Sequence, residues 1–401
     1  MSAPSIIADT SVIKTMRKLR IPQTERNREL ALLLVAFVVN VAMVLLVQLG
    51  ATGAIETTLV SLTATLAALV FGLHICLRYV APKADPLLLP IVTVLNGIGV
   101  AMIYRIDLAR GATGWSAFST RQIVWSAIAI IAAMTVILVV RNHRVLFRYT
   151  YIFGLAAFVL LLLPLVPGLG KRVNGAQVWI GIGDLLTFQP GEVAKIALAI
   201  FFAGYLVRTR DRRFLGVQFP RLRDLGPIVV VWVLSMGVIV FQRDLGTALL
   251  YFGMFTVMIY VATGRLSWVL IGLGLFGGGA AIASQSLTYV NGRFHNWLDA
   301  FSQDVYDADG GSFQLLQGIF GLAHGGLVGT GLGQGRPSIT PLAESDYIIA
   351  SLGEELGLAG LFAILCLYLV FVGRGIRVGF LDGDDFGKLL ALGLSFTVAL
   401  Q

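Results

Sequence analysis

Long apolar stretches separated by short polar connections make up the chain from about residue 30 to its end. Ten or eleven of them approach the roughly 20 residues that an α-helix needs to cross a bilayer. They lie at about 30–49, 58–80, 86–104, 122–140, 149–166, 191–207, 225–241, 246–263, 266–287, 346–372 and from 388 onward. The pattern predicts an all-α polytopic membrane protein, a helical bundle with about eleven transmembrane helices in this chain.

Composition supports this prediction. The chain is 57% hydrophobic and 13% charged, whereas soluble domains carry about 25% charged residues. The first 28 residues are polar and basic, and the apolar stretch after them is too long for a signal peptide. Cys76 and Cys366 fall in separate spans, which excludes a disulfide framework and a cysteine metal cluster.

Basic residues mark every second connection between the spans. The net charge of +8 therefore indicates positive-inside topology rather than nucleic-acid binding, and it places the N-terminus in the cytoplasm. The basic residues of the N-terminal segment and of the cytoplasmic connections are Lys14, Arg17, Lys18, Arg20, Arg26 and Arg28, then Lys83, then Arg141, Arg144 and Arg148, then Arg208, Arg210, Arg212, Arg213, Arg221 and Arg223, then Arg265, and then Arg374 and Arg377. The long connections 105–121, 167–190 and 288–345 are then expected to face outward.

Acidic residues stand at the start of the tenth apolar stretch. A carboxylate in hydrocarbon costs about 2.5 kcal/mol or more unless it is paired or used, and Asp346, Glu354 and Glu355 fall within ten residues. Asp346 follows the long outward connection and fits two roles, a helix N-cap and a general base at the outer interface. Glu355 fits helix packing or a contact with substrate.

Two further outward helix starts carry charges. Pro190 and Glu192 suit the first turn of a helix, and Lys195 follows Glu192 at i+3. This is either a local pair or part of a binding site in which Lys195 meets an anion or another carboxylate, such as Asp346. Asp244 beside Arg243 is either an interfacial pair or a functional group.

The glycine-rich segment 310–335 reads as an amphipathic interfacial helix followed by a turn. It lacks a Walker-type Gly-Lys-Ser/Thr sequence, which argues against a nucleotide cofactor, and nothing indicates a redox cofactor. His324 alone makes no metal site. Asp299 and Asp304, upstream, are read as solvated loop acids, with a place in the outer cavity as the alternative.

Taken together, these residues resemble the SEDS family of RodA and FtsW, over roughly residues 85–401. The matching segments are Asn174-Gly-Ala-Gln-Val-Trp179, Phe188-Gln-Pro-Gly-Glu-Val-Ala-Lys195, Asp244-Leu-Gly-Thr247, residues 310–335, Ser345-Asp-Tyr-Ile348 and Gly353-Glu-Glu-Leu-Gly357. Two extra N-terminal spans favour the actinobacterial RodA branch over FtsW. Three parts are then expected: a basic segment 1–28, two added helices in 29–84 and a SEDS core in 85–401. The family has a further helix, twelve in all, so the chain is expected to be a fragment.

The resemblance implies a peptidoglycan glycosyltransferase that polymerises lipid II outside the cytoplasmic membrane during cell elongation, together with a class B penicillin-binding protein. It places the family's essential acid on Asp346, its lysine and glutamate on Lys195 and Glu192, and another acid on Asp244; Glu355 is a further candidate. The α-linked donor and β-1,4-linked product require one inversion, hence one base, Asp346. Lys195 would offset charge on the leaving pyrophosphate, with a divalent cation, Mg²⁺ or Mn²⁺, as a candidate helper.

Two other functions fit the same residues. A lipid II flippase would need acid and base groups on both faces of the membrane, whereas here they gather outside. A non-catalytic scaffold for a penicillin-binding protein would tolerate substitution of the charged helix starts. Following fluorescent lipid II into polymer or across liposomes separates the three.

Overall fold

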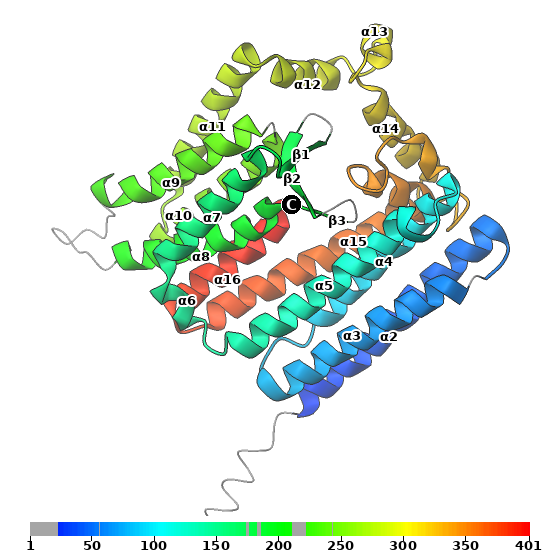
Figure 1. The fold of residues 1–401 in the computed structure, drawn as a ribbon, viewed down its shortest axis with the longest axis horizontal. Helices are drawn as coiled ribbons and strands as arrows, with labels where there is room; N and C mark the ends of the chain where they lie inside the picture. Colours follow the sequence, from blue (N-terminus) through cyan, green and yellow to red (C-terminus); the bar gives the residue numbers. More distant parts are fainter. Residues whose placement is uncertain (1–22, 56, 174–175, 183–185, 211–221, 243) are drawn as a thin grey trace, which may run out of the picture. The chain divides into compact units, whose positions relative to one another are not determined.

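The computed structural model describes residues 23–401 except 56, 174–175, 183–185, 211–221 and 243. Helices dominate it, and three short strands form its sheet (Figure 1). The elements in chain order are α2 (Gln23–Thr52), α3 (Thr57–Val80), α4 (Leu88–Arg110), η1 (Gly114–Ser116), α5 (Phe118–Val139), α6 (Arg144–Arg148), α7 (Thr150–Leu162), η2 (Leu163–Leu165), β1 (Gly170–Val173), β2 (Ala176–Ile182), β3 (Leu186–Phe188), α8 (Pro190–Arg210), α9 (Leu222–Phe241), α10 (Leu245–Thr263), α11 (Leu266–Ser286), α12 (Thr288–Leu298), α13 (Gln303–Asp307), α14 (Phe313–Gly325), η3 (Pro337–Ile339), α15 (Ile348–Leu381) and α16 (Asp385–Leu400).

Each of the eleven predicted apolar stretches overlaps one of these helices. Within the described part of the chain, eight helices are long and apolar enough to cross a membrane: α2, α3, α4, α5, α8, α10, α11 and α15. The apolar helix formed by α7 and η2 is shorter. The prediction of a helical, multi-pass membrane protein is confirmed, while eleven as the number of spans stays a prediction.

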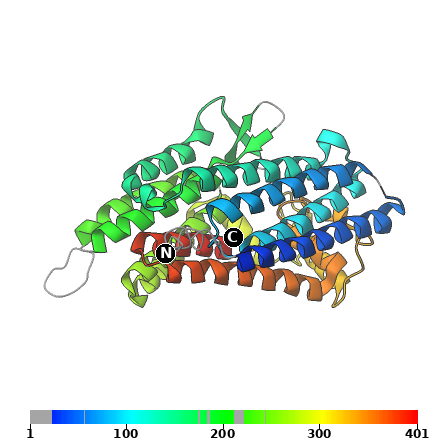
Figure 2. The ribbon, with the colours of Figure 1, turned by 90° about the horizontal axis from the view of Figure 1, so that it is seen from below.

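The chain divides into two compact units, and the first holds the N-terminal helices. Unit 1 consists of Met1–Arg141, Val328–Ser338 and Leu342–Leu356. In it α2 packs on α4, while α3 and α4 both pack on α5, and these blue to cyan helices run side by side in both views (Figures 1 and 2). Asn40 of α2 donates from Nδ2 to the carbonyl of Thr93 on α4, at 2.9 Å. Such an interhelical bond stabilises packing where lipid offers no alternative partner.

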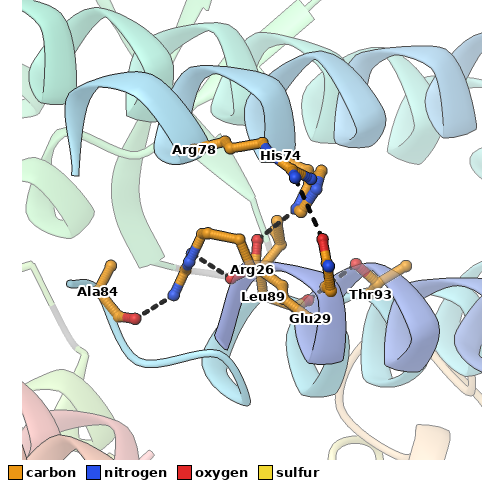
Figure 3. A network of polar contacts seen from close by, with 8 residues as sticks. Arg26, Glu29, His74, Arg78, Ala84, Leu89 and Thr93 are labelled. Carbon is orange, nitrogen blue, oxygen red and sulfur yellow. Dashed lines mark hydrogen bonds and ion pairs between the residues drawn. The ribbon is translucent and has the colours of Figure 1, made fainter. Parts of the chain in front are cut away.

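A buried ion network ties the start of α2 to its neighbours in unit 1 (Figure 3). The guanidinium of Arg26 pairs with Glu29 and donates to the carbonyl of Ala84, just before α4. The second oxygen of Glu29 lies 2.6 Å from Nδ1 of His74 on α3. Arg26 and Glu29 are fully buried, so each needs the other to offset its desolvation cost. The network fixes α2 against α3 and the start of α4.

Unit 2, which comprises Asn142–Leu327, Ile339–Pro341 and Gly357–Gln401, has its core where α7, α8, α10 and α16 meet (Figure 1). The centre of this core includes Phe202, Tyr251, Met254 and Met258, each 1% exposed or less. Since the driving force for helix association in lipid is close packing rather than water exclusion, these dense contacts define the arrangement of the four helices.

An antiparallel sheet occupies the predicted outward connection 167–190. Its order is β1-β2-β3, with Lys171 opposite Trp179 and Ile180 opposite Phe188. Gln177 of β2 donates from its side chain to the carbonyl of Pro164, at 3.0 Å, so the sheet is attached to the end of η2. The sequence of this segment indicates only a connection, because three strands of three to seven residues give almost no periodic signal.

The connection predicted at 105–121 is shorter than expected because α4 continues to Arg110. The helix ends at Gly111, whose φ of 68° is left-handed and whose N–H bonds back into the last turn, a common helix C-terminus. Arg105 and Asp107 therefore lie on the helix and not in a loop. The connection 288–345 also contains structure: α12, α13, α14 and η3. The helix expected in residues 310–335 is α14.

The helix α15 is interrupted at Gly357, where φ is 69° and ψ is −175°. This region of backbone space is essentially restricted to glycine. On the unit 1 side, the carbonyls of Glu354 and Glu355 accept hydrogen bonds from the N–H groups of Thr330 and Gly331, at 2.9 and 3.1 Å. On the unit 2 side, the N–H groups of Leu358 and Ala359 donate to carbonyls of residues 326 and 327. In unit 1, residues 328–336, the glycine-rich loop, thus satisfy carbonyls that the interruption leaves open, and residues 326 and 327 do the same for the amides within unit 2.

Candidate active site

In unit 2, the start of α8 holds the predicted pair of Glu192 and Lys195. Pro190 is the first helical residue, as predicted. Lys195 Nζ lies 2.7 Å from the Glu192 carboxylate, and it donates to the side chain of Gln401 at 3.1 Å. The Lys195 side chain is 7% exposed and that of Glu192 is 49% exposed. The acid therefore lies at the surface of the protein and keeps a buried ammonium paired.

Asp244 lies at the start of α10. It is the N-cap of α10 and accepts hydrogen bonds from the N–H of Thr247 at 3.0 Å and from its hydroxyl at 2.6 Å. The hydroxyl of Tyr251, also on α10, donates to the carbonyl of Gly191 at 2.7 Å, which joins α10 to the first turn of α8. The structure thus pairs Glu192 with Lys195 and makes Asp244 the cap of a helix that bonds to the same first turn. Arg243, the proposed partner of Asp244, lies outside the described residues.

In unit 1, Asp346 lies in a tight turn that leads into α15. The carbonyl of Leu342 accepts the N–H groups of Ser345 and Asp346, both at 3.1 Å, and Leu342 itself has a φ of 53°. A left-handed conformation costs a leucine about 1–2 kcal/mol, and such strain persists where the surrounding structure holds it in place. The helix begins at Ile348, which puts Tyr347 at the cap position and Asp346 one residue before it.

The Asp346 side chain is exposed and forms no hydrogen bond or ion pair with any described residue. In this it differs from the other four candidates: Glu192, Lys195, Asp244 and Glu355 all have partners on the protein. A carboxylate that accepts no hydrogen bond from the described residues is open to a hydroxyl donor from outside. Its geometry therefore fits the predicted base better than the predicted cap.

Glu355 lies farther along α15 and is engaged on both oxygens. Oε1 is 2.9 Å from Nε of Arg105 on α4, and Oε2 accepts the N–H of Gly333 at 2.8 Å. Arg105 also donates to the carbonyl of Gly335, at 2.7 Å. Glu355 is 1% exposed and Arg105 is 7% exposed. These contacts support the packing role for Glu355, and a contact with substrate stays a prediction.

Arg105 and Asp107 are structural residues that sequence reasoning missed. Asp107 is 1% exposed and accepts the N–H groups of Phe118 and Ser119, at 2.9 and 2.7 Å, so it fixes the start of α5. Their positions in the chain carried a signal, because Gly111 after the run Arg105–Arg110 is a typical helix end.

The candidate residues divide between the two units. Asp346 and Glu355 belong to unit 1, whereas Glu192, Lys195 and Asp244 belong to unit 2. The predicted partnership of Lys195 with Asp346 stays a prediction; within unit 2, Lys195 pairs with Glu192.

Comparison with known proteins adds a family to this geometry. The family model for FtsW, RodA and SpoVE, described as "Cell cycle protein", matches residues 86–401. The chain belongs to this family. The match begins just before α4, so α2 and α3 precede the part that the FtsW/RodA/SpoVE family shares.

Individual members of the FtsW/RodA/SpoVE family align over most of the chain. The peptidoglycan glycosyltransferase RodA of Mycobacterium tuberculosis is 43% identical over 387 residues, which cover 94% of this chain and 81% of that protein. The RodA of Mycobacterium leprae is 42% identical over the same shares. A solved structure, described as structural coordination of polymerization and crosslinking by a peptidoglycan synthase complex, has a TM-score of 0.50 at 22% identity and covers 84% of this chain and 82% of its own. It supports the fold alone.

The ion pair of Arg110 with Glu344, just before Asp346, leads to a prediction about acid stability. The two side chains are 2.7 Å apart. Burial opposes ionisation of Glu344, but the hydrogen bond and positive charge of Arg110 outweigh it and hold the pKa of Glu344 below its usual value. A carboxylate with a lowered pKa stabilises the fold above its unfolded-state pKa, and that contribution is lost as the pH falls through the folded value.

We therefore expect Glu344→Gln to lower the melting temperature of the purified protein at pH 7, and the difference from wild type to shrink as the pH falls below about 4.3, the usual pKa of glutamate. Thermal unfolding in detergent between pH 7 and pH 3.5 measures this. Asp304→Asn, a change at an exposed acid on the short helix α13, is the control. A difference from wild type that does not depend on pH would contradict the ion-pair explanation.

Proposed function

We propose that this protein is a peptidoglycan glycosyltransferase that polymerises lipid II into β-1,4-linked glycan strands for cell elongation and shape. The single observation that carries the proposal is the 43% identity to peptidoglycan glycosyltransferases named RodA, which extends over 94% of the chain. The exposed carboxylate of Asp346 supplies the group that this chemistry requires, at a position that the family resemblance selects independently.

The reaction that we propose is one inverting displacement. Asp346 accepts the proton of the 4-hydroxyl on the incoming sugar while that oxygen attacks the anomeric carbon of the donor. The bond from the anomeric carbon to the pyrophosphate oxygen breaks, and its electron pair leaves with undecaprenyl pyrophosphate. Lys195 offsets the charge on that leaving group. Its pairing with Glu192 keeps the ammonium oriented before substrate arrives.

A divalent cation is a secondary part of the proposal. Among the described residues, no three His, Cys, Asp or Glu side chains gather as ligands, and both oxygens of Asp244 are engaged by Thr247. Mg²⁺ commonly binds through one or two carboxylates together with substrate phosphates. A cation would thus arrive with the pyrophosphate, and no step above depends on it. A class B penicillin-binding protein is the proposed partner.

We place the active site on the outer face of the membrane. Unit 1 supports this by its own geometry, since Ala84 and the basic residues around it mark the start of α4 and Glu344 pairs with Arg110 at its end. A helix of 23 residues is about 35 Å long, enough to separate two sides of a bilayer. Lys83 and Asp346 then lie on opposite sides.

This orientation predicts the outcome of cysteine labelling. In intact cells, a membrane-impermeant maleimide should label Asp346→Cys, whereas Lys83→Cys should react only after permeabilisation. Both native residues are exposed. The background control is the parent chain, in which Cys76 and Cys366 are partly buried. Labelling of Lys83→Cys in intact cells, with none at Asp346→Cys, would show that the protein has the opposite orientation in the membrane.

The function itself is tested with fluorescent lipid II. Purified protein together with its penicillin-binding partner should convert lipid II into a glycan ladder on a gel. In liposomes, the same protein should not accelerate the movement of fluorescent lipid II between leaflets. Accelerated movement without polymer would favour a flippase, and neither activity would favour a scaffold.

A further inference from the structure

The end of α2 packs against residues 332–334 of the glycine-rich loop in unit 1. Gln334 donates from Nε2 to the carbonyl of Gly50, at 2.8 Å. A Cβ atom on Gly50 would lie 2.2 Å from the carbonyl oxygen of Leu332, and one on Gly333 would lie 2.7 Å from the backbone nitrogen of Ala51. Both distances are too short for any real side chain. Helix and loop therefore meet backbone to backbone.

The opposite side of the same loop holds the acids of α15. The N–H of Gly333 donates to Glu355, and the N–H of Arg336 donates to Glu354 at 3.0 Å. Arg105 joins the loop to Glu355 through its bond to Gly335. Residues 332–336 thus lie between α2 and the first part of α15, which begins two residues after Asp346.

The helix α2 is itself firmly held. Its first turns carry the buried network of Arg26, Glu29 and His74 (Figure 3), and Asn40 binds α4 midway along. Near its end, Gln48 donates to the hydroxyl of Tyr104 on α4, at 3.2 Å. Because α2 is held at its start, middle and end, a bulkier residue at its contact with the loop should displace the loop rather than the helix.

The family match begins at residue 86, so α2 lies outside it and is assigned no part in the reaction. We propose that α2 is a positioning element for the active site. Gly50 and Gln334 position the loop, the loop positions Glu354 and Glu355, and these hold the first part of α15, which begins two residues after Asp346. This inference rests on the proposed function.

Gly50→Ala is the sharpest test, with Gly99→Ala as its matched control. Both glycines lie inside helices of unit 1, where alanine favours the helix more than glycine does. Only Gly50 faces a backbone atom, since a Cβ on Gly99 would meet nothing within 4 Å. We expect Gly50→Ala to lower kcat for lipid II polymerisation by roughly tenfold to a hundredfold, because a displacement near 1 Å can cost a reacting group that much. KM should change little.

Two further readouts make the result decisive. Hydrogen–deuterium exchange at the amides of residues 328–336 should rise in Gly50→Ala and stay as in wild type in Gly99→Ala, whether or not the protein polymerises lipid II. Melting temperatures identify simple unfolding, and if Gly50→Ala does not fold, Gln334→Ala gives the same comparison with a smaller expected loss.

The outcomes separate the two proposals. If the wild-type protein makes no polymer, the proposed function is overturned. Faster amide exchange at residues 328–336 in Gly50→Ala would then still show that α2 holds the loop in place. The positioning role is overturned if the wild-type protein is active and Gly50→Ala or Gln334→Ala is equally active. It is also overturned if the loss of polymerisation activity follows the fall in melting temperature alone.

Discussion

Replacing Asp346 with asparagine should lower lipid II polymerisation by about 10²- to 10⁴-fold, the usual contribution of a positioned general base. Asparagine keeps the size of the side chain and removes the oxygen that can take a proton. We expect the fold to be unchanged, because the carboxylate is exposed and forms no hydrogen bond or ion pair with any described residue. Polymer formed by purified protein with its partner is the measurement.

Asp304→Asn is the control for this experiment, since it removes the same charge from an exposed position on the short helix α13 and should leave activity near wild type. Asp346→Glu adds a second comparison: it keeps the base but moves it by one methylene, so partial activity is expected. Wild-type rates in Asp346→Asn would mean that another group takes the proton.

Breaking the buried pair of Arg105 and Glu355 should cost more stability than any other single change discussed here. Arg105→Met leaves a carboxylate that is 1% exposed without its counter-charge, and removal of one partner from a buried pair costs about 3–5 kcal/mol. The melting temperature in detergent and the yield of folded protein report the loss. The glycine-rich loop should exchange its amide protons faster, because Arg105 also binds Gly335.

Arg28→Met is the matched control, because Arg28 pairs with Glu25 at 3.2 Å with side chains 68% and 46% exposed, and exposed pairs are worth about 0–1 kcal/mol. Arg105→Met combined with Glu355→Leu should recover part of the lost stability, since an apolar replacement of a whole buried pair is often tolerated. Equal melting temperatures for Arg105→Met and Arg28→Met would show that the buried pair contributes little.

The sequence predicted the features that depend on neighbours in the chain. Apolar stretches gave the helices, because each must satisfy its own backbone in lipid. The pair of Glu192 and Lys195 followed from a spacing of three residues, and Pro190 marked the start of α8. These are local rules, and here tertiary packing did not override them.

Features that join distant parts of the chain were missed. Arg105 and Glu355 are 250 positions apart, so nothing near either residue indicates its partner. The end of α4 was placed too early because its charged residues read as a loop, although their charges are satisfied by α5 and α15. For the interruption of α15, glycine at position 357 hints at a break, but only the loop that bonds to both sides explains why the break is stable.

The interruption of α15 also bears on which substitutions this part of the chain can accept. The groups that face the break are main-chain amides and carbonyls, at Thr330, Gly331, Glu354 and Glu355 within unit 1. A point mutation changes a side chain and leaves those amides and carbonyls in place. Substitution at these four positions therefore preserves the main-chain bonds beside the break, whereas any side chain at Gly357 would strain the backbone, because φ is 69° and ψ is −175° there.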